Sequence, residues 1–179
     1  EGFMKDIKTV MFDNVVFKKR AIGMGIITRT WITRFGITGP NARAAGVPMD
    51  VRKDYPYLCY PELDFEPITG QDSDIYTRAD VRRRDILLSI DLIRQMLPKV
   101  PDRGDIRAKT PNVLHWKVPA GETWKRAECT RGEYGYYLVS DGSEYPRRVN
   151  VRGPSYTHAV ALLEKMIINC NIADVAGLM

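Results

Sequence analysis

Two segments of the sequence combine arginines with carboxylates and could support polar chemistry. The first, GPNARAAGVPMDVRKDYPY at residues 39–57, holds Arg43, Asp50 and Arg52 among tyrosines. A guanidinium can hold a carboxylate through two parallel hydrogen bonds. We therefore predict that Arg43 or Arg52 pairs with Asp50 or Asp54 and anchors this segment. Composition alone favours the simplest interpretation, an ordinary loop pinned by one Asp–Arg pair.

The second segment, RGEYGYYLVSDGSEYPRRVNVRGPSY at residues 131–156, opens with Arg131 and Glu133 in a tight turn. The end of a strand can carry a guanidinium into a cavity, although arginines in hairpin turns are usually solvated. His115 and His158 are far apart in the sequence and lack a carboxylate–histidine–serine pattern, so two ordinary surface or half-buried histidines are favoured over a hydrolytic triad. The stretch GITGPN has no nucleotide-binding glycine spacing.

Composition narrows the class of protein. The 179 residues are 44 % hydrophobic, which is enough for one core, and we predict a single domain over residues 1–179. The 27 basic and 22 acidic residues are mixed along the chain, so a nucleic-acid partner is not indicated.

Cysteine content, hydropathy and the two ends of the sequence add further expectations. Cys59, Cys129 and Cys170 form no CxxC pair, which suits a reducing cytoplasm and predicts neither a metal site nor a bound cofactor in this chain. No apolar run approaches the roughly 18 to 20 residues of a membrane span, so membrane association would come through a partner. The sequence opens without Met and stops within an apolar helical pattern, which predicts a fragment of a longer subunit.

The pattern of apolar residues predicts the elements that position these side chains. We expect a helix over residues 6–21 with a break near Asp13 and Asn14, and a short helix over 28–35. Residues 36–74 are rich in glycine and proline and are predicted to be loop with extended segments. A long helix over 75–97, capped within Asp72–Asp74 and ended by Pro98, should bury an apolar stripe of Ile86, Ile90, Ile93 and Leu97.

The sequence pattern of the C-terminal third predicts a three-stranded meander followed by a helix. Strands are expected at 124–129, 134–139 and 147–151, joined by turns at TRGE and SDGS. Ser155 should cap the final helix. Its predicted buried stripe contains Tyr156, Val160, Leu163 and Ile167. The expected fold class is α+β, with helices packed on a small antiparallel meander.

Three stretches together resemble one family. They are GPNARAAGVPMDVRKDYPY, DIYTRADVRRRDILLSIDLIRQML and RGEYGYYLVSDGSEYPRRVNVRGPSY, which occur in family order between about residues 20 and 177. The sequence is similar to the D subunit, the large quinone-site subunit, of NADH-quinone oxidoreductase (respiratory complex I). Tyr156 stands where that family usually has Phe. The resemblance implies that the chain is the C-terminal part of such a subunit.

The same family is homologous to the large subunit of nickel–iron hydrogenases, whose fold the resemblance implies here. In those relatives the arginine of the Arg-Gly turn overhangs the metal site and the Pro-Ser segment faces it. The matching residues are Arg131, Pro154 and Ser155, which the resemblance places at the rim of a quinone cavity. There an arginine could hydrogen-bond a quinone carbonyl or stabilise the negative charge that appears on reduction. The resemblance provides no catalytic residue in this chain, because the family's quinone ligands, a His and a Tyr, belong to its N-terminal part. It provides no metal-binding residue, because neither hydrogenase CxxC pair is present in this sequence.

The function implied by the resemblance is that of a subunit of a proton-pumping oxidoreductase. Electrons from NADH or another donor would pass through an iron–sulfur cluster of a neighbouring subunit to quinone, on the cytoplasmic side of the membrane. Partners would be the iron–sulfur subunit and the membrane subunits, and the isolated chain is expected to be inactive. Two alternatives remain: the large subunit of a membrane-bound energy-converting hydrogenase, and a docking subunit without catalysis.

Overall fold

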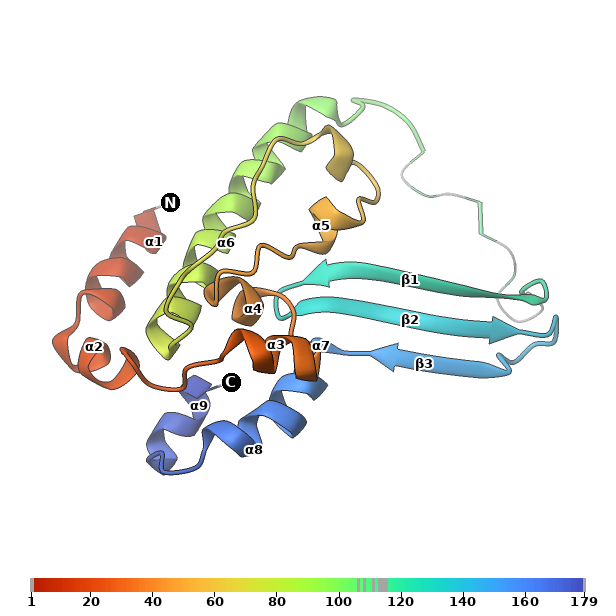
Figure 1. Cartoon of the computed structure of the whole chain (residues 1–179). Helices are drawn as coiled ribbons and strands as arrows, with labels where there is room; N and C mark the ends of the chain where they lie inside the picture. The colour runs from red at the N-terminus through yellow and green to blue at the C-terminus, as the bar shows by residue number, and fades with distance from the viewer. Residues whose placement is uncertain (1, 106, 108, 111, 113–115, 179) are drawn as a thin grey trace.

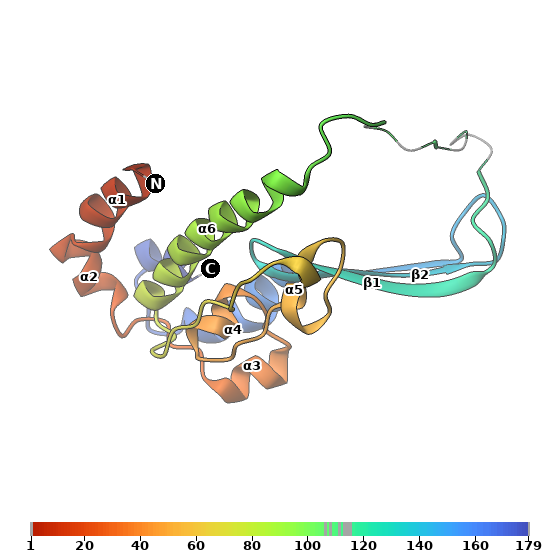
Figure 2. The same ribbon diagram turned by 90° about the horizontal axis from the view of Figure 1, so that it is seen from above.

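The computed structural model describes residues 2–105, 107, 109–110, 112 and 116–178. A body of helices carries a long sheet that extends from it to one side (Figure 1). Viewed from above, the long helix α6 and the sheet leave the body in the same general direction (Figure 2). The predicted α+β class is confirmed. None of the helices in the described part has both the length and the apolarity needed to cross a bilayer.

The N-terminal helices follow the prediction. Helix α1 (Gly2–Ile7) continues into a π-helical turn (Lys8–Phe12), and α2 (Val15–Ala21) starts after a break. The Asn14 side chain accepts hydrogen bonds from two backbone N–H groups of α2, so a capping residue causes the break predicted at this position. Helix α3 (Arg29–Phe35) is capped by Thr28 and ends at Gly36, which has φ of 61°.

The prediction that residues 36–74 form a loop is wrong in one respect, because this segment contains short helices. They are α4 (Pro40–Ala44), α5 (Val51–Asp54) and the 3₁₀ helix η2 (Tyr60–Glu62). Pro40 lies in the first turn of α4, where a missing N–H costs nothing, and Asp50 caps α5. Pro40 and Pro61, two of the prolines that suggested loop, therefore lie in the first turns of helices instead of interrupting them.

Helix α6 (Ile75–Met96) is capped by Asp74 as predicted and passes into the 3₁₀ turn η3 (Leu97–Lys99). The predicted buried stripe is wrong: Ile86, Ile93 and Leu97 are 48 %, 52 % and 62 % exposed. The buried residues of α6 are Ile75, Arg78, Val81 and Leu92, so its middle and C-terminal parts turn a different face inward. Polar groups of α4 and of the chain around Gly25 exchange hydrogen bonds with this face, so its charged residues can be buried.

The meander is confirmed as strands β1 (Gly121–Cys129), β2 (Gly132–Ser140) and β3 (Arg148–Arg152), antiparallel in the order β1-β2-β3. Cys129 pairs with Gly132 across the tight turn, and Tyr137 pairs with Asn150. The Thr130–Arg131 turn lies at the end of the sheet nearest the helical body, and the other end extends away from it (Figure 1).

The C-terminal region forms α7 (Pro154–Tyr156), a π-helical stretch (Thr157–Leu162), α8 (Leu163–Met166), the 3₁₀ helix η6 (Ile172–Asp174) and α9 (Val175–Leu178). Two predictions are wrong here. Gly153, not Ser155, precedes the helix. His158 and Leu162 of the π-helical stretch and Met166 of α8 are buried, while the predicted stripe residues Tyr156, Val160 and Ile167 are exposed. Leu163, the fourth residue of the predicted stripe, is half-buried and packs against the main core.

The main core joins both ends of the chain. Ile27, Ile32, Ile37 and Ala42 pack with residues of α6 and of the C-terminal helices, and a small second cluster contains Leu63, Phe65 and Leu92. One close backbone contact fixes the sheet on this body. A Cβ on Gly39 (φ 69°) would overlap the backbone of Gly132, and one on Gly132 (φ 123°) would lie 2.7 Å from Thr38 Oγ1. Only glycines permit this approach, which brings α4 beside the Arg131 turn.

Candidate functional site

A cavity of about 550 Å³ lies where the Arg131 turn, α6 and the C-terminal helices meet. We refer to it as the Arg131 cavity. Its polar lining residues are Arg82, Arg131, Ser155 and His158. Arg131 Nη1 donates a hydrogen bond of 3.1 Å to Ser155 Oγ. The predicted proximity of these two residues, on one concave surface, is therefore confirmed.

Pro154, the third predicted rim residue, is buried at the start of α7. It does not belong to the described lining of the Arg131 cavity. Its carbonyl accepts a hydrogen bond of 2.9 Å from Thr157 Oγ1. Pro154 thus fixes the helix start that presents Ser155, and the side chain facing the cavity is that of its neighbour.

His158 is 6 % exposed and is held by a polar chain from α6. Arg82 Nη2 donates to Asn41 Oδ1 at 3.0 Å, which turns the amide nitrogen of Asn41 toward His158. That nitrogen lies 3.2 Å from Nδ1 and 3.4 Å from Nε2 of the ring. An amide N–H₂ group can only donate, so it bonds to whichever ring nitrogen carries no proton, and a neutral imidazole offers one such nitrogen.

The electrostatic surroundings of His158 agree with a neutral ring. Burial, followed by the charges of Arg82, Arg78, Arg152 and Arg131, lowers the pKa of His158 to about 4. Burial also lowers the pKa of Arg82, and the neighbouring charge of Arg131 adds to this effect. The described part of the cavity is therefore a place where positive charges repel one another.

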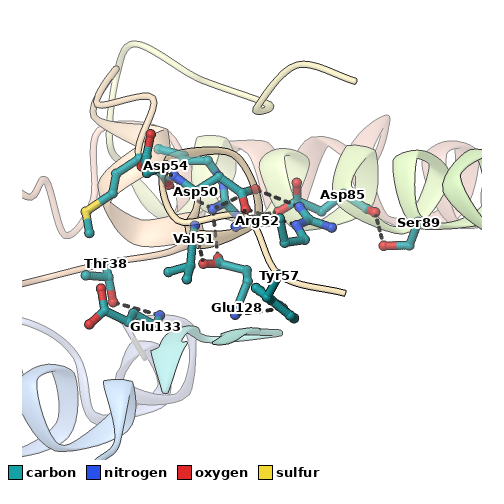
Figure 3. A network of polar contacts seen from close by, with 12 residues as sticks. Thr38, Asp50, Val51, Arg52, Asp54, Tyr57, Asp85, Ser89, Glu128 and Glu133 are labelled. Atoms are coloured by element: carbon teal, nitrogen blue, oxygen red, sulfur yellow. Dashed lines mark hydrogen bonds and ion pairs between the residues drawn. The ribbon is translucent and has the colours of Figure 1, made fainter. Parts of the chain in front are cut away.

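A second polar network lies on the other side of α4 and contains the predicted loop anchors (Figure 3). Arg52 holds Asp50 through two side-chain hydrogen bonds, Nε to Oδ1 at 2.9 Å and Nη2 to Oδ2 at 2.7 Å. The predicted Arg–Asp pair is confirmed. Asp50 also accepts from the Arg52 backbone N–H and so caps α5.

Arg43 has partners that the sequence did not indicate. Its Nη1 donates to Glu128 Oε1 at 2.9 Å, and its Nη2 donates to Asp85 Oδ2 at 2.9 Å. Asp50 Oδ2 lies 3.6 Å from Nη1. Glu128 accepts in addition from the Val51 N–H at 3.2 Å. Arg43 therefore ties α4 to α6, β1 and α5.

Burial and ion pairing shift the pKa values of Arg43, Glu128 and Asp50 in opposite directions. Burial alone would lower the pKa of Arg43, but the carboxylates of Asp85 and Glu128 outweigh it and raise that pKa. Burial raises the pKa of Glu128 more than Arg43 lowers it. Burial would likewise raise the pKa of Asp50, but the hydrogen bonds and charge of Arg52 lower it.

The network borders a second cavity of about 660 Å³. Its polar side is formed by the network, including Arg43, Asp85 and Glu128, and its apolar side by Ile86, Ile90 and Ile93 of α6. Arg82 lines both this cavity and the Arg131 cavity. One residue of α6 therefore lies between the two cavities.

Sequence reasoning missed Asn41, Arg82, Asp85, Glu128 and the role of His158. A signal was present in α6, because Arg78, Arg82 and Asp85 recur at helical spacing and so share one face. His115 lies outside the described residues. In the described part of the chain, no three His, Cys, Asp or Glu side chains gather where they could hold a metal ion. The absence of a resident metal or cofactor remains a prediction.

Comparison with known proteins gives consistent matches over the whole chain. Residues 1–117 and 110–179 match the family described as respiratory-chain NADH dehydrogenase, 49 Kd subunit. The D subunit of the F(420)H(2) dehydrogenase of Methanosarcina mazei is 38 % identical over 178 residues, which is 98 % of this chain and 47 % of that protein. The D subunit of the NADH-quinone oxidoreductase of Thermosipho melanesiensis is 38 % identical over 98 % of this chain and 48 % of its own length.

One solved structure is similar in fold and sequence. It is that of the membrane-bound sulfane sulfur reductase, an archaeal respiratory membrane complex, with a TM-score of 0.89 and 39 % identity. The match covers 99 % of this chain and 48 % of the other. The chain thus spans about half the length of these relatives.

Proposed function

Because the chain belongs to the family of the 49 kDa subunit of respiratory-chain NADH dehydrogenase, we propose that it forms one wall of the site where a membrane-associated respiratory complex reduces its electron acceptor. The relatives are subunits of oxidoreductases, and this family role is the premise. We propose quinone as the acceptor, because the Thermosipho melanesiensis relative is a subunit of an NADH-quinone oxidoreductase.

The observation that carries the proposal is the hydrogen bond of Arg131 to Ser155 at the Arg131 cavity. Quinone takes up two electrons and two protons to give quinol, and negative charge develops on its oxygens before protonation. A guanidinium held in place beforehand stabilises such charge without reorganising. Ser155 fixes the direction of the Arg131 side chain, and the apolar remainder of the cavity suits a quinone ring.

The iron–sulfur cluster that delivers the electrons would belong to a neighbouring subunit. Cluster binding needs a set of thiolates or an equivalent, and Cys59, Cys129 and Cys170 lie in separate places in the described fold. The partners would be that subunit and the membrane subunits, which would couple the reaction to proton pumping. We place the chain peripherally on the cytoplasmic side of the membrane.

The test uses the full-length subunit in its assembled complex with the substitution Arg131→Met. We expect kcat/KM for a short-chain quinone to fall by about 100-fold or more, as on removal of one donor to a developing anion. Reduction of an artificial dye that accepts electrons before they reach the Arg131 cavity should stay unchanged. Arg148→Met, which removes an exposed arginine of β3, is the matched control. Unaltered quinone reduction in Arg131→Met would refute the proposal.

A second acceptor is favoured by one observation, the similarity to the sulfane sulfur reductase complex. A sulfur chain is smaller than a quinone and can carry charge at its ends, which the arginines of the Arg131 cavity would hold. Side-by-side assays with quinone and polysulfide distinguish the two. Hydrogen uptake by the complex would instead select the energy-converting hydrogenase alternative. A complex that assembles but reduces none of these would be left with the docking role.

A further inference from the structure

The described lining of the Arg131 cavity contains arginines but no carboxylate. Arg82 and Arg131 line it, and none of its described lining residues is acidic. On the sheet side, the carboxylate of Glu133 lies 3.7 Å from Arg152 Nε and 3.8 Å from Arg126 Nη1. Glu133 therefore balances two other arginines. Asp85 offsets part of the charge of Arg82, so the positive charge on the cavity wall is chiefly that of Arg131.

Two further arginines act on His158, which is one of the lining residues of the cavity. Arg78 is 1 % exposed, and its Nη1 donates only to the carbonyls of Gly25 and Ser73 at 2.6 Å among the bonds of the described residues. Carbonyl oxygens solvate the guanidinium, and the carboxylate of Asp74 offsets part of its charge. Arg78 and Arg152 both act on His158 together with Arg82 and Arg131. A bound negative charge would offset the repulsion between these arginines.

The donors that face the cavity are arranged for such a charge. Arg131 presents a planar guanidinium that can hold two acceptor atoms at once. Since Ser155 Oγ accepts the bond from Arg131 at 3.1 Å, its own O–H can turn toward the cavity and donate. The lining residues Ala79, Ala159, Ala176, Met11 and Phe17 are apolar and limit competition from water.

We propose that the Arg131 cavity is an anion-binding site. Its ligand is a compact anion with at least two acceptor atoms, either an oxyanion or the charged end of a sulfur chain, bound by Arg131 and Ser155 with Arg82 opposite. This inference rests on the proposed function, because it specifies the charge state in which the same cavity holds its acceptor. A neutral acceptor would be held most tightly after it has gained charge.

The experiment titrates inorganic sulfate into the purified full-length subunit with its accompanying subunits, at constant ionic strength set with potassium chloride. Calorimetry should show saturable binding of sulfate. Arg131→Met should weaken the affinity at least tenfold, Arg131→Lys less, and the exposed matched control Arg148→Met should leave it unchanged. Sulfate should also compete with the acceptor, raising KM without changing kcat.

Two results would overturn the inference: no saturable sulfate binding by the wild type, or equal binding by the wild type and Arg131→Met. Competition that changes kcat alone would place the sulfate elsewhere and count equally against it. Loss of acceptor reduction in Arg131→Met without any sulfate binding would leave the proposed function standing and remove the anion site. Sulfate binding that is lost in Arg131→Met, together with normal acceptor reduction by that variant, would support the anion site and refute the proposed function.

Discussion

Arg43 shows how a single buried residue joins four elements. Its side chain is 2 % exposed and contacts carboxylates from α6, β1 and the cap of α5. Three carboxylates, Asp50, Asp85 and Glu128, share two arginines, Arg43 and Arg52. Removing one arginine therefore leaves more than one buried negative charge without compensation.

Replacing Arg43 with Met is expected to lower the free energy of unfolding by about 3 to 5 kcal/mol, as is usual when one partner of a buried ion pair is removed. Chemical denaturation of the purified subunit measures this. Arg84→Met is the matched control, because Arg84 pairs with Asp80 on a more exposed face and should cost less than about 1 kcal/mol. Equal losses for the two variants would show that the network contributes little.

His158 makes stability depend on pH. Its pKa in the folded protein is about 4, below the ordinary value of 6.5, so between these values the unfolded chain binds a proton that the folded chain does not. Stability is therefore complete above about pH 6.5 and falls as the pH drops toward 4, by up to about 3 kcal/mol.

The variant His158→Gln should remove this dependence. The measurement is the difference in unfolding free energy between wild type and variant at a series of pH values, since the other titrating groups are common to both. We expect the difference to shift in favour of the variant as the pH falls from 6.5 to 4. A difference that stays constant over this range would mean that His158 is protonated in the folded protein.

At the level of secondary-structure elements, α6 has two unlike faces. The inward face buries Val81 and Leu92 with Arg78, while Ile86 and Ile93 remain exposed beside the second cavity. Charged residues turn inward because α4 offers them partners, as Asn41 does for Arg82 and Arg43 does for Asp85.

Two neighbouring substitutions test this orientation. Leu92→Ala should cost about 2 to 5 kcal/mol of unfolding free energy, because Leu92 is 2 % exposed in the small cluster with Leu63 and Phe65. Ile93→Ala, one position further and 52 % exposed, should change stability by less than about 1 kcal/mol. A larger loss for Ile93→Ala would place the buried face of α6 on the side that the hydrophobic periodicity predicted.

Considered as a whole molecule, the chain spans about half the length of its relatives. A cavity built jointly with another part of the protein cannot position its substrate when one wall is missing. The exposed apolar residues of the N-terminal helices, α6 and the sheet, such as Val10, Ile93 and Val151, also fit a chain that forms part of a larger assembly.

We therefore expect the isolated 179-residue chain to fold but to be colourless and inactive. Elemental analysis should find no stoichiometric iron or nickel, and acceptor reduction should not exceed that of buffer. The full-length subunit in its complex serves as the positive control. Stoichiometric metal or acceptor reduction by the isolated chain would require a self-contained site in this half of the protein.

Local structure could be predicted from the sequence alone. Asp74 caps α6 as predicted, the break expected near Asp13 and Asn14 is present, the short helix expected over residues 28–35 forms, and the two turns of the meander fall at the predicted residues. The Asp50–Arg52 pair was also predictable, since its members lie two positions apart. Each of these features depends on interactions between residues close in the chain, which the local sequence encodes.

Which faces are buried, and which distant groups meet, depended on tertiary packing. Arg43 reaches Asp85 and Glu128, 42 and 85 positions away, and Asn41 reaches His158 across 117 positions. Hydrophobic periodicity assigned the wrong inner face to α6 and to the final helix, because it cannot register that a charged residue is stable in the interior when a partner is supplied from elsewhere. Ser155 was expected both as a helix cap and near Arg131 at a cavity rim. It does not cap the helix but accepts a hydrogen bond from Arg131, because the close approach of Gly39 and Gly132 brings the turn, α4 and the C-terminal helices together.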